Sequence, residues 1–384
     1  ALLRRGPVRV RLATKPFLGW VELPIVTADL PGVAEDRFVL FSGHVDSWHY
    51  GAMDNGTANA TQLEVAQLLA ERRGELRRGV RLAFWSGHSH GRYAGSCWYA
   101  DTFWRELHER CVCHVNIDSV GAIGASVLEE APTMAETYRF GRQVLREVAD
   151  VELEYKRISR SSDQSFWGHG IPSLYASLSE QPRDESSATG AALATLLGGG
   201  GKGGGLGWWW HTTEDTLDKI DPDNLHRDAR IYAEALWQLC TAERLPFDYA
   251  AVADECAAAL DRYHEAAGGA LDLSHSRALA GELGERLRGL DPGQRDVEAA
   301  NGLLMALGRV LIPVNYTRSG PFEHDLALGT TVLPGLSDAG GLGQHDPTSD
   351  DFRFLQTKLL RECNRVEYAL RTALKLVDAL QEGR

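Results

Sequence analysis

Short apolar runs alternate with segments of helical periodicity over the first two hundred or so residues, and this alternation restricts the fold more than any other feature. The runs Phe38–Phe41, Val80–Trp85 and Cys113–Ile117 are typical of buried strands. Ala58–Arg72 and Glu136–Val148 gather their apolar residues on one helical face. The alternation predicts an α/β domain with a mostly parallel central sheet and helices on both of its faces.

Weaker patterns lie around this framework. Val8–Leu12 alternates apolar and basic residues, so we expect a strand there, within a run of strands from Arg4 to Val39. Ala100–Arg110 is predicted to be an amphipathic helix. Gln181–Gly207 is polar and then almost pure glycine, and we expect a flexible loop because it cannot bury enough apolar surface.

The pattern becomes helical beyond Asp221. Helices are expected over Asn224–Thr241, Tyr249–Ala267, Ser276–Leu290, Asp296–Val310 and Asp351–Gln381, with an irregular excursion from Pro313 to Pro347. We place a domain boundary near residue 245. The prediction is an α/β domain over residues 1–245 and a helical, dimerisation-type domain over residues 246–384.

Composition argues against nucleic acid and membrane as partners. The formal net charge is −13, whereas phosphate binding needs a basic surface. We expect no apolar run to approach the roughly 18 residues of a membrane helix. The six scattered cysteines are interpreted as mostly buried thiols, which favours a cytoplasmic location. The chain opens on Ala1 without a signal-peptide pattern, so a natural N-terminal portion could be missing.

Imidazoles and carboxylates follow the predicted strands at the points where the strands end. These are His44, Asp46 and Asp54 after the first strand, His88 and His90 after the second, Asp118 after the third, and His211 after the glycine-rich stretch. Because parallel strands end at one edge of a sheet, we expect these side chains to share a crevice. The set suits a divalent metal, zinc first, and an aspartate shared by two ions would set them roughly 3.5–4 Å apart.

Each residue alone has an ordinary structural explanation. A single histidine at a strand end is commonly just hydrogen-bonded, and Asp54-Asn55-Gly56 is typical of a turn and helix cap. Their occurrence at successive strand ends is what favours a site. Since His44 and Asp46 share one side of an extended segment, Asp46 could hydrogen-bond a neighbouring ligand and fix its orientation.

Five blocks occur in order between about residues 38 and 221. They are GHVDSWHYGAMDNG, the stretch Trp85–Tyr99, NIDSVG, RSSDQSFWGHGIPSL and WWHTTEDTLDKID. Together they resemble the signature of the zinc aminopeptidase and glutamate carboxypeptidase II family. The C-terminal helices resemble, more loosely, the dimerisation domain of its glutamate carboxypeptidase and transferrin receptor branch, which implies a homodimer.

The resemblance implies metal ligands. His44, Asp54 and Asp118 would hold one zinc ion. Asp54 would bridge to a second ion, which His211 would also bind. Asp46 would be the carboxylate that orients a ligand.

The chain departs from the family at one block. The family has two adjacent glutamates there, a general base and then a ligand, whereas this chain has His88-Ser89-His90. Aligned from the left, His88 and Ser89 take those places; aligned from the right, Ser89 and His90 do. Imidazole is both a good zinc ligand and a competent base, so the two histidines could supply one of each, with His88 expected to face the metals.

The sequence therefore predicts a metal-dependent hydrolase of peptide or amide bonds, exopeptidase-like, with metal-bound water as nucleophile and a histidine as proton shuttle. Trp208, Trp209 and Trp210 could line the substrate or simply pack. Two alternatives stay open. One is an acyl-transferring or cyclising relative, since glutaminyl cyclases resemble this family. The other is a binding or scaffold protein, which the absent glutamates favour.

Overall fold

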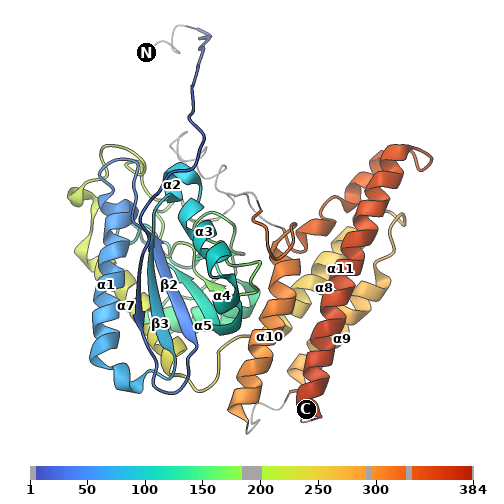
Figure 1. The fold of residues 1–384 in the computed structure, drawn as a ribbon. Coiled ribbons are helices and arrows are strands. Elements are labelled where there is room, and N and C mark those ends of the chain that lie inside the picture. Colours follow the sequence, from blue (N-terminus) through green and yellow to red (C-terminus); the bar gives the residue numbers. More distant parts are fainter. Residues whose placement is uncertain (1–5, 184–200, 291–295, 326–330, 383–384) are drawn as a thin grey trace.

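A five-stranded sheet organises the first half of the chain in the computed structural model, which describes residues 6–183, 201–290, 296–325 and 331–382 (Figure 1). The strand order is β1-β3-β2-β4-β5. The strands are β1 (Val26–Leu30), β2 (Phe38–His44), β3 (Gly79–Trp85), β4 (Cys111–Asn116) and β5 (Ser173–Leu174). Only the β1–β3 pair is antiparallel. The predicted mostly parallel sheet is thereby confirmed.

Helices cover both faces of the sheet because β2 alternates its side chains between two apolar clusters. Val39 and Phe41 point into the larger cluster, and Phe38 and Leu40 point into the smaller one on the opposite face. The first face is covered by α1 (Ala58–Glu71), α5 (Ala135–Ala149) and α7 (Pro222–Thr241), and the second by α3 (Ala94–Thr102) and α4 (Trp104–Arg110). Both faces of β2 are therefore buried, as its continuous apolar sequence requires.

Four long helices follow the sheet and lie to one side of it in Figure 1. They are α8 (Tyr249–Ala266), α9 (Ser274–Arg288), α10 (Val297–Tyr316) and α11 (Asp350–Gln381). α8 packs on α9, and α11 packs on both α9 and α10. The boundary placed near residue 245 falls in the connection between α7 and α8, and buried residues on both sides of it belong to one apolar cluster.

Arg309 fastens α10 to the sheet domain. Its guanidinium donates to the carbonyl oxygens of His108, Gly170 and Cys111, at 2.6, 2.7 and 2.6 Å. The backbones come very close here, since a Cβ at Gly170 would lie 2.3 Å from the Cα of Arg309. Gly170 also has a φ of +70°, so a glycine is needed there on both counts.

Shorter elements connect these parts. They are η2 (Ala52–Thr57), η3 (Arg73–Glu75), α2 (His88–Gly91), η4 (Leu217–Lys219), η5 (Pro334–Leu336) and η6 (Ala339–Gln344). The excursion expected from Pro313 begins only after α10 ends at Tyr316. Of the predicted loop Gln181–Gly207, residues 184–200 lie outside the described part. Its two ends pair with each other, because Arg183 N–H donates to Lys202 O and Gly204 N–H donates to Gln181 O.

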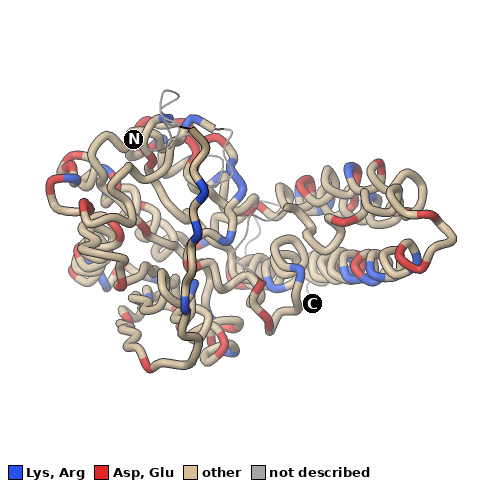
Figure 2. The backbone as a smooth tube through the Cα atoms, turned by 90° about the horizontal axis from the view of Figure 1, so that it is seen from above, with Lys and Arg blue, Asp and Glu red and all other residues tan. Residues whose placement is uncertain are grey.

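The predicted strand at Val8–Leu12 is wrong. Residues 7–25 form neither helix nor strand, and Leu12, Leu18 and Trp20 are largely exposed. The segment projects from the body in Figure 1, and Figure 2 shows basic residues spaced along it. Alternation alone does not make a strand, because a strand also needs a neighbour for its backbone hydrogen bonds, and the first paired strand is β1.

Two predicted helices differ from the structure by more than two residues at an end or are divided. The expected helix Ala100–Arg110 is divided into α3 and α4 at Phe103, whose φ and ψ of −106° and 25° leave the helical region. α10 continues past Val310 and contains Pro313, because its last turns are apolar and buried. By length and composition α10 could cross a membrane, contrary to the expectation that no run approaches that length, and half of its apolar window is buried inside the molecule.

Candidate metal centre

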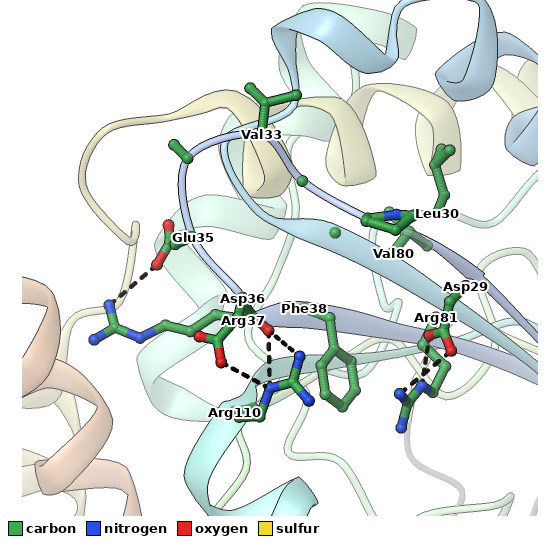
Figure 3. Close-up of a pocket in the computed structure, with 14 residues that line it drawn as sticks. Asp29, Leu30, Val33, Glu35, Asp36, Arg37, Phe38, Val80, Arg81 and Arg110 are labelled. Carbon is green, nitrogen blue, oxygen red and sulfur yellow. Dashed lines mark hydrogen bonds and ion pairs between the residues drawn. The ribbon is translucent and has the colours of Figure 1, made fainter.

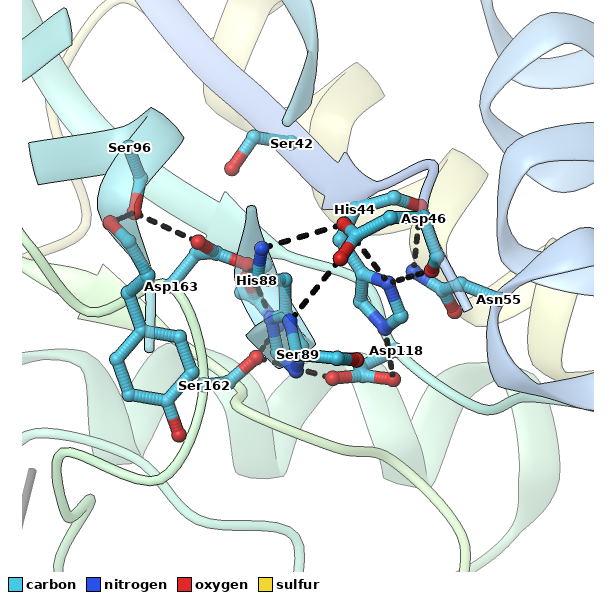
Figure 4. Close-up of polar contacts among 12 residues, drawn as sticks. Ser42, His44, Asp46, Asn55, His88, Ser89, Ser96, Asp118, Ser162 and Asp163 are labelled. Carbon is cyan, nitrogen blue, oxygen red and sulfur yellow. Dashed lines mark hydrogen bonds and ion pairs between the residues drawn. The ribbon is translucent and has the colours of Figure 1, made fainter. Parts of the chain in front are cut away.

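The carboxyl ends of β2, β3 and β4 meet at one edge of the sheet, and several predicted site residues gather there, as Figure 4 shows for His44, Asp46, His88 and Asp118. His44 is the last residue of β2, Asp118 follows β4 by two residues, and His88 opens α2 just after β3. Asp54 lies in η2, the turn that leads into α1. The parallel sheet thus brings together residues that are far apart in the sequence.

Asp54 lies between the two imidazoles that the family resemblance implies would bind different ions. His44 Nε2 is 2.9 Å from Asp54 Oδ1 and 3.4 Å from Asp118 Oδ1. His211 Nε2 is 3.0 Å from the other oxygen, Asp54 Oδ2. One carboxylate therefore presents one oxygen to each imidazole, the arrangement that a bridging ligand needs.

His88 is fixed by a buried carboxylate that the sequence analysis did not assign. Its Nδ1 is 2.7 Å from Asp163 Oδ2, and its ring stacks on that of His44 with centroids 3.8 Å apart and planes 13° apart. One ring nitrogen each from His44 and His88 and one oxygen of Asp118 lie within 4.8 Å of one another. Asp163 belongs to the block RSSDQSFWGHGIPSL, so the resemblance marked the segment without giving a role to this residue.

Asp46 contributes differently from the expectation. The Nδ1 of His44 is 2.7 Å from the main-chain oxygen of Asp46 but 3.9 Å from its carboxylate. The carboxylate instead accepts the backbone N–H groups of His88 and Ser89, at 3.2 and 3.1 Å. The carbonyl orients the His44 ring, while the side chain holds the start of α2 in place.

Two further side chains support the turn around Asp54. Asp215 accepts the backbone N–H groups of Met53 and Asp54, at 2.9 and 3.0 Å. Asn55 donates to the carbonyl oxygens of His44 and Ile117 and accepts from Ser119 N–H. Both residues lie in family-like blocks, but Asn55 had been interpreted only as part of a turn and Asp215 had been given no role.

Electrostatics at the site favour a cation. Burial alone would lower the pKa of His44, but Asp118 and Asp54 outweigh it and raise that pKa well above its ordinary value. Burial would raise the pKa of Asp54, yet His211 and His44 hold it well below its usual range. In the described part of the chain, no lysine or arginine forms an ion pair with Asp54, Asp118 or Asp163.

The donor set fits a divalent metal. His44 Nε2 is buried and faces both carboxylates, yet it makes no hydrogen bond of normal geometry within the described residues. Such an unsatisfied atom between two carboxylates is costly unless a further group occupies the space. Imidazole nitrogen and carboxylate oxygen are the ligands of zinc, so the residues present fit that ion.

A cavity elsewhere in the domain is separate from this cluster. It has a volume of about 680 Å³ and is lined by residues 29–38, 79–81 and 110 (Figure 3). Because β2 begins at Phe38 and ends at His44, this cavity lies at the opposite edge of the sheet. Its arginines Arg37, Arg81 and Arg110 are already paired with carboxylates.

The family model for "Peptidase family M28" matches residues 26–236, which is more than half of the chain and contains every predicted metal ligand. The chain belongs to peptidase family M28. The match covers the sheet, the cluster and α7 up to Leu236. The family placement from sequence is confirmed.

Individual relatives are more distant. The mouse protein "Aminopeptidase NAALADL1" is 24% identical over 388 aligned positions, which cover 90% of this chain and 51% of the mouse protein. A maize "Probable glutamate carboxypeptidase VP8" is 30% identical over 117 positions, 29% of this chain and 16% of the maize protein. A zinc aminopeptidase of Bacillus subtilis has a similar fold, with a TM-score of 0.44 and 21% identity over 57% of this chain and 50% of that one. The chain thus spans about half the length of its curated mouse relative.

In this M28 chain the segment His88-Ser89-His90 places its side chains in different surroundings. His88 enters the cluster, whereas the side chain of His90 is 62% exposed, with Nδ1 3.6 Å from Asp46 Oδ2. Ser89 Oγ is buried and without a hydrogen-bond partner among the described residues. The structure therefore brings His88, and not His90, to the predicted ligands, and their division of roles stays a prediction.

The three tryptophans before His211 have three different environments. Trp209 is buried against Met53, Ala122 and Ala125. Trp210 stacks on His211 with ring centroids 3.7 Å apart, and Trp208 is 70% exposed. Trp209 therefore has a packing role, and Trp210 orients the ring of His211. Substrate binding by these tryptophans stays a prediction, which rests mainly on the exposed Trp208.

Proposed function

We propose that this protein is a zinc-dependent hydrolase of peptide or small amide substrates, acting at a chain end. The observation that carries the proposal is the sharing of Asp54, whose two oxygens lie 2.9 and 3.0 Å from the imidazoles of His44 and His211. Membership of a peptidase family supports it, as does the match to a protein named an aminopeptidase over most of the chain.

The ligands divide into two groups around Asp54. His44, Asp118 and one Asp54 oxygen would hold the first ion, and His211 and the other Asp54 oxygen the second. When bound, zinc supplies a Lewis acid that polarises a substrate carbonyl and activates water. Asp215 and Asn55 fix the backbone on either side of the shared carboxylate, so the ligand set is pre-oriented.

His88 is proposed as the group that carries the proton. Burial would raise the pKa of Asp163, but His88 and His44 lower it, so Asp163 is an anion that accepts the Nδ1–H of His88. With Nδ1 held by Asp163, Nε2 of His88 is the ring nitrogen proposed to exchange a proton with water and with the leaving amine. A buried carboxylate behind the imidazole also stabilises the protonated ring.

Ring geometry supports this role over that of sharing an ion with His44. An imidazole binds a metal through the lone pair in its ring plane, with zinc about 2.0–2.1 Å from the nitrogen. The planes of His44 and His88 are stacked 13° from parallel with centroids 3.8 Å apart. Lone pairs in nearly parallel planes do not converge, so one ion cannot meet both rings in plane.

Metal content tests the site, and peptide hydrolysis tests the reaction. In protein purified without added zinc, we expect bound zinc in the wild type and its loss in His44→Ala. We expect His88→Ala to retain zinc and lose hydrolysis of unblocked tripeptides, while His90→Ala, its exposed control, retains both. Loss of one zinc in His88→Ala would make that residue a ligand, and a wild type without zinc would refute the proposed function.

A cytoplasmic location and a homodimer formed through the helical region are also proposed. All six cysteines are free thiols, and five of them are buried, which supports a reducing compartment. Phe354 and Tyr368 on α11 are 74% and 75% exposed, and their apolar surface supports self-association. Light scattering of wild type beside Tyr368→Glu tests the dimer, and equal monomer masses for both would refute it.

A further inference from the structure

A second cluster of reactive groups surrounds Cys97, outside the predicted metal ligands. Cys97 lies in the first turn of α3 and is partly exposed. Arg160 Nη2 donates to its sulfur at 3.1 Å, and Ser165 Oγ is 3.3 Å from the same atom. His324, from the segment after α10, is near enough to influence the thiol electrostatically, and its Nε2 is 2.9 Å from Asp101 Oδ1.

These contacts favour the thiolate. Burial would raise the pKa of Cys97, but the interactions of the thiol with His324 and Ser165 and the charges of His324 and Arg160 outweigh burial, and the pKa is lowered. The pKa of His324 is raised in turn, first by Cys97 and also by Asp101. The sulfur thus accepts from a guanidinium, with His324 nearby, at the amino end of a helix, where a negative charge is stabilised.

Arg160 is held beside Cys97 by burial and by a second hydrogen bond. Its side chain is buried, it also donates to the carbonyl oxygen of Asp325, and its Nε has no partner among the described residues. A buried guanidinium with a spare donor beside a sulfur offers a further hydrogen bond to an oxygen atom placed on that sulfur. A group added to Cys97 would therefore lie beside a guanidinium that still has an unused donor.

We propose that Cys97 is a site of reversible oxidation by hydroperoxides. The thiolate attacks one oxygen of the peroxide, so that an S–O bond forms, the O–O bond breaks, and hydroxide or alkoxide leaves. Sulfur is oxidised by two electrons to sulfenic acid and the peroxide is reduced. A small thiol then displaces water from the sulfenic acid to give a mixed disulfide, and a second small thiol releases Cys97 again.

A disulfide within the chain does not compete with this route. The other five cysteines, Cys111, Cys113, Cys240, Cys256 and Cys363, are all buried. Burial raises the pKa of Cys111 to about 11 and that of Cys240 to about 12. These thiols stay protonated near neutral pH and are withheld from solvent, so reaction is expected at Cys97 alone.

The test measures the alkylation rate of each cysteine by mass spectrometry across pH, in the folded protein and in the urea-unfolded chain. For folded Cys97 we expect a half-maximal rate at lower pH, and at pH 7 a thiolate fraction about tenfold higher than in the unfolded chain. Arg160→Gln and His324→Gln should shift the midpoint upward. Arg105→Gln, at an exposed arginine on α4, is the matched control and should leave it unchanged.

A second arm measures oxidation itself. After a brief exposure to hydrogen peroxide, a sulfenate-specific probe such as dimedone should label Cys97 in the wild type, and label nothing in Cys97→Ser. A Cys97 midpoint equal to that of the unfolded chain would overturn the thiolate assignment. A lowered midpoint without any dimedone adduct would overturn the oxidation site, and His324→Gln provides an independent variant if Arg160→Gln does not fold.

Discussion

The buried side chain of Glu136 allows a sharp test of how burial changes the pKa of a carboxyl group and, through it, the stability of the protein. It lies in the first turn of α5, is fully buried, and neither of its carboxyl oxygens has a hydrogen-bond partner among the described residues. Burial, with a smaller contribution from the charge of Glu255, raises its pKa to about 8. In the folded protein Glu136 is therefore protonated at neutral pH, whereas in the unfolded chain it ionises near its ordinary value of 4.5.

The sign of the pH dependence follows from this difference. Between pH 4.5 and 8 the folded state holds a proton that the unfolded state has lost, so the contribution of Glu136 to stability decreases as pH rises. The slope is about 1.4 kcal/mol per pH unit in this window. Glu136→Gln removes the titration, so its unfolding free energy relative to wild type should rise by about 3 kcal/mol from about pH 5.5 to about pH 7.5.

Urea unfolding followed by tryptophan fluorescence at several pH values across this window measures the difference. The change with pH is the informative quantity, because the buried amide of the glutamine variant adds an offset that is the same at each pH. Glu152→Gln is the matched control, since Glu152 is exposed and pairs with arginines at the surface. Parallel curves for Glu136→Gln and wild type would refute a buried, protonated Glu136.

Other predictions concern the cluster and the core. Added zinc should stabilise the wild type by about 2.7 kcal/mol at about a hundred times its dissociation constant, and calorimetry should show no such gain for Asp54→Asn. Asp163→Asn should lower the rate of peptide hydrolysis about tenfold or more while zinc content stays unchanged, because His88 loses its anionic partner. Ser89→Ala should keep its activity, and an inactive but fully zinc-loaded variant would contradict the base role of His88. Phe41→Ala should cost about 3–5 kcal/mol in denaturant unfolding, because Phe41 is fully buried in the larger apolar cluster.

The sequence predicted the residues of the cluster best where a buried strand delivers them. His44 and Asp118 end adjacent parallel strands, and strand polarity alone places them at one edge. His211 was expected in the same crevice although it follows a glycine-rich stretch and not a buried strand, and the resemblance to a family implied its role as a ligand. Asp163 went unassigned because it follows no buried strand and is separated from β5 by the nine residues 164–172, which form neither helix nor strand.

The direction in which a loop side chain points was harder to predict than the place of its residue in the fold. Asp46 was placed correctly next to His44, but the period of an extended segment ends with β2 at His44, so its carboxylate turns to the backbone of α2. The same limit applies to Val8–Leu12. Its residues do alternate between apolar and basic, but the segment has no neighbouring strand with which to pair. Periodicity describes one segment, whereas pairing and side-chain direction depend on what lies beside it.

The junction made by Arg309 has a practical consequence for anyone who wishes to shorten this chain. Residues 245–249 look like a natural place to cut, yet a fragment ending there would leave the carbonyl oxygens of His108, Gly170 and Cys111 without the guanidinium that all three share. It would also uncover Leu245 and the surface that Tyr249 now fills. The helical region therefore covers part of the surface of the sheet domain. The smallest fragment that can be expected to preserve the geometry of the cluster includes α10.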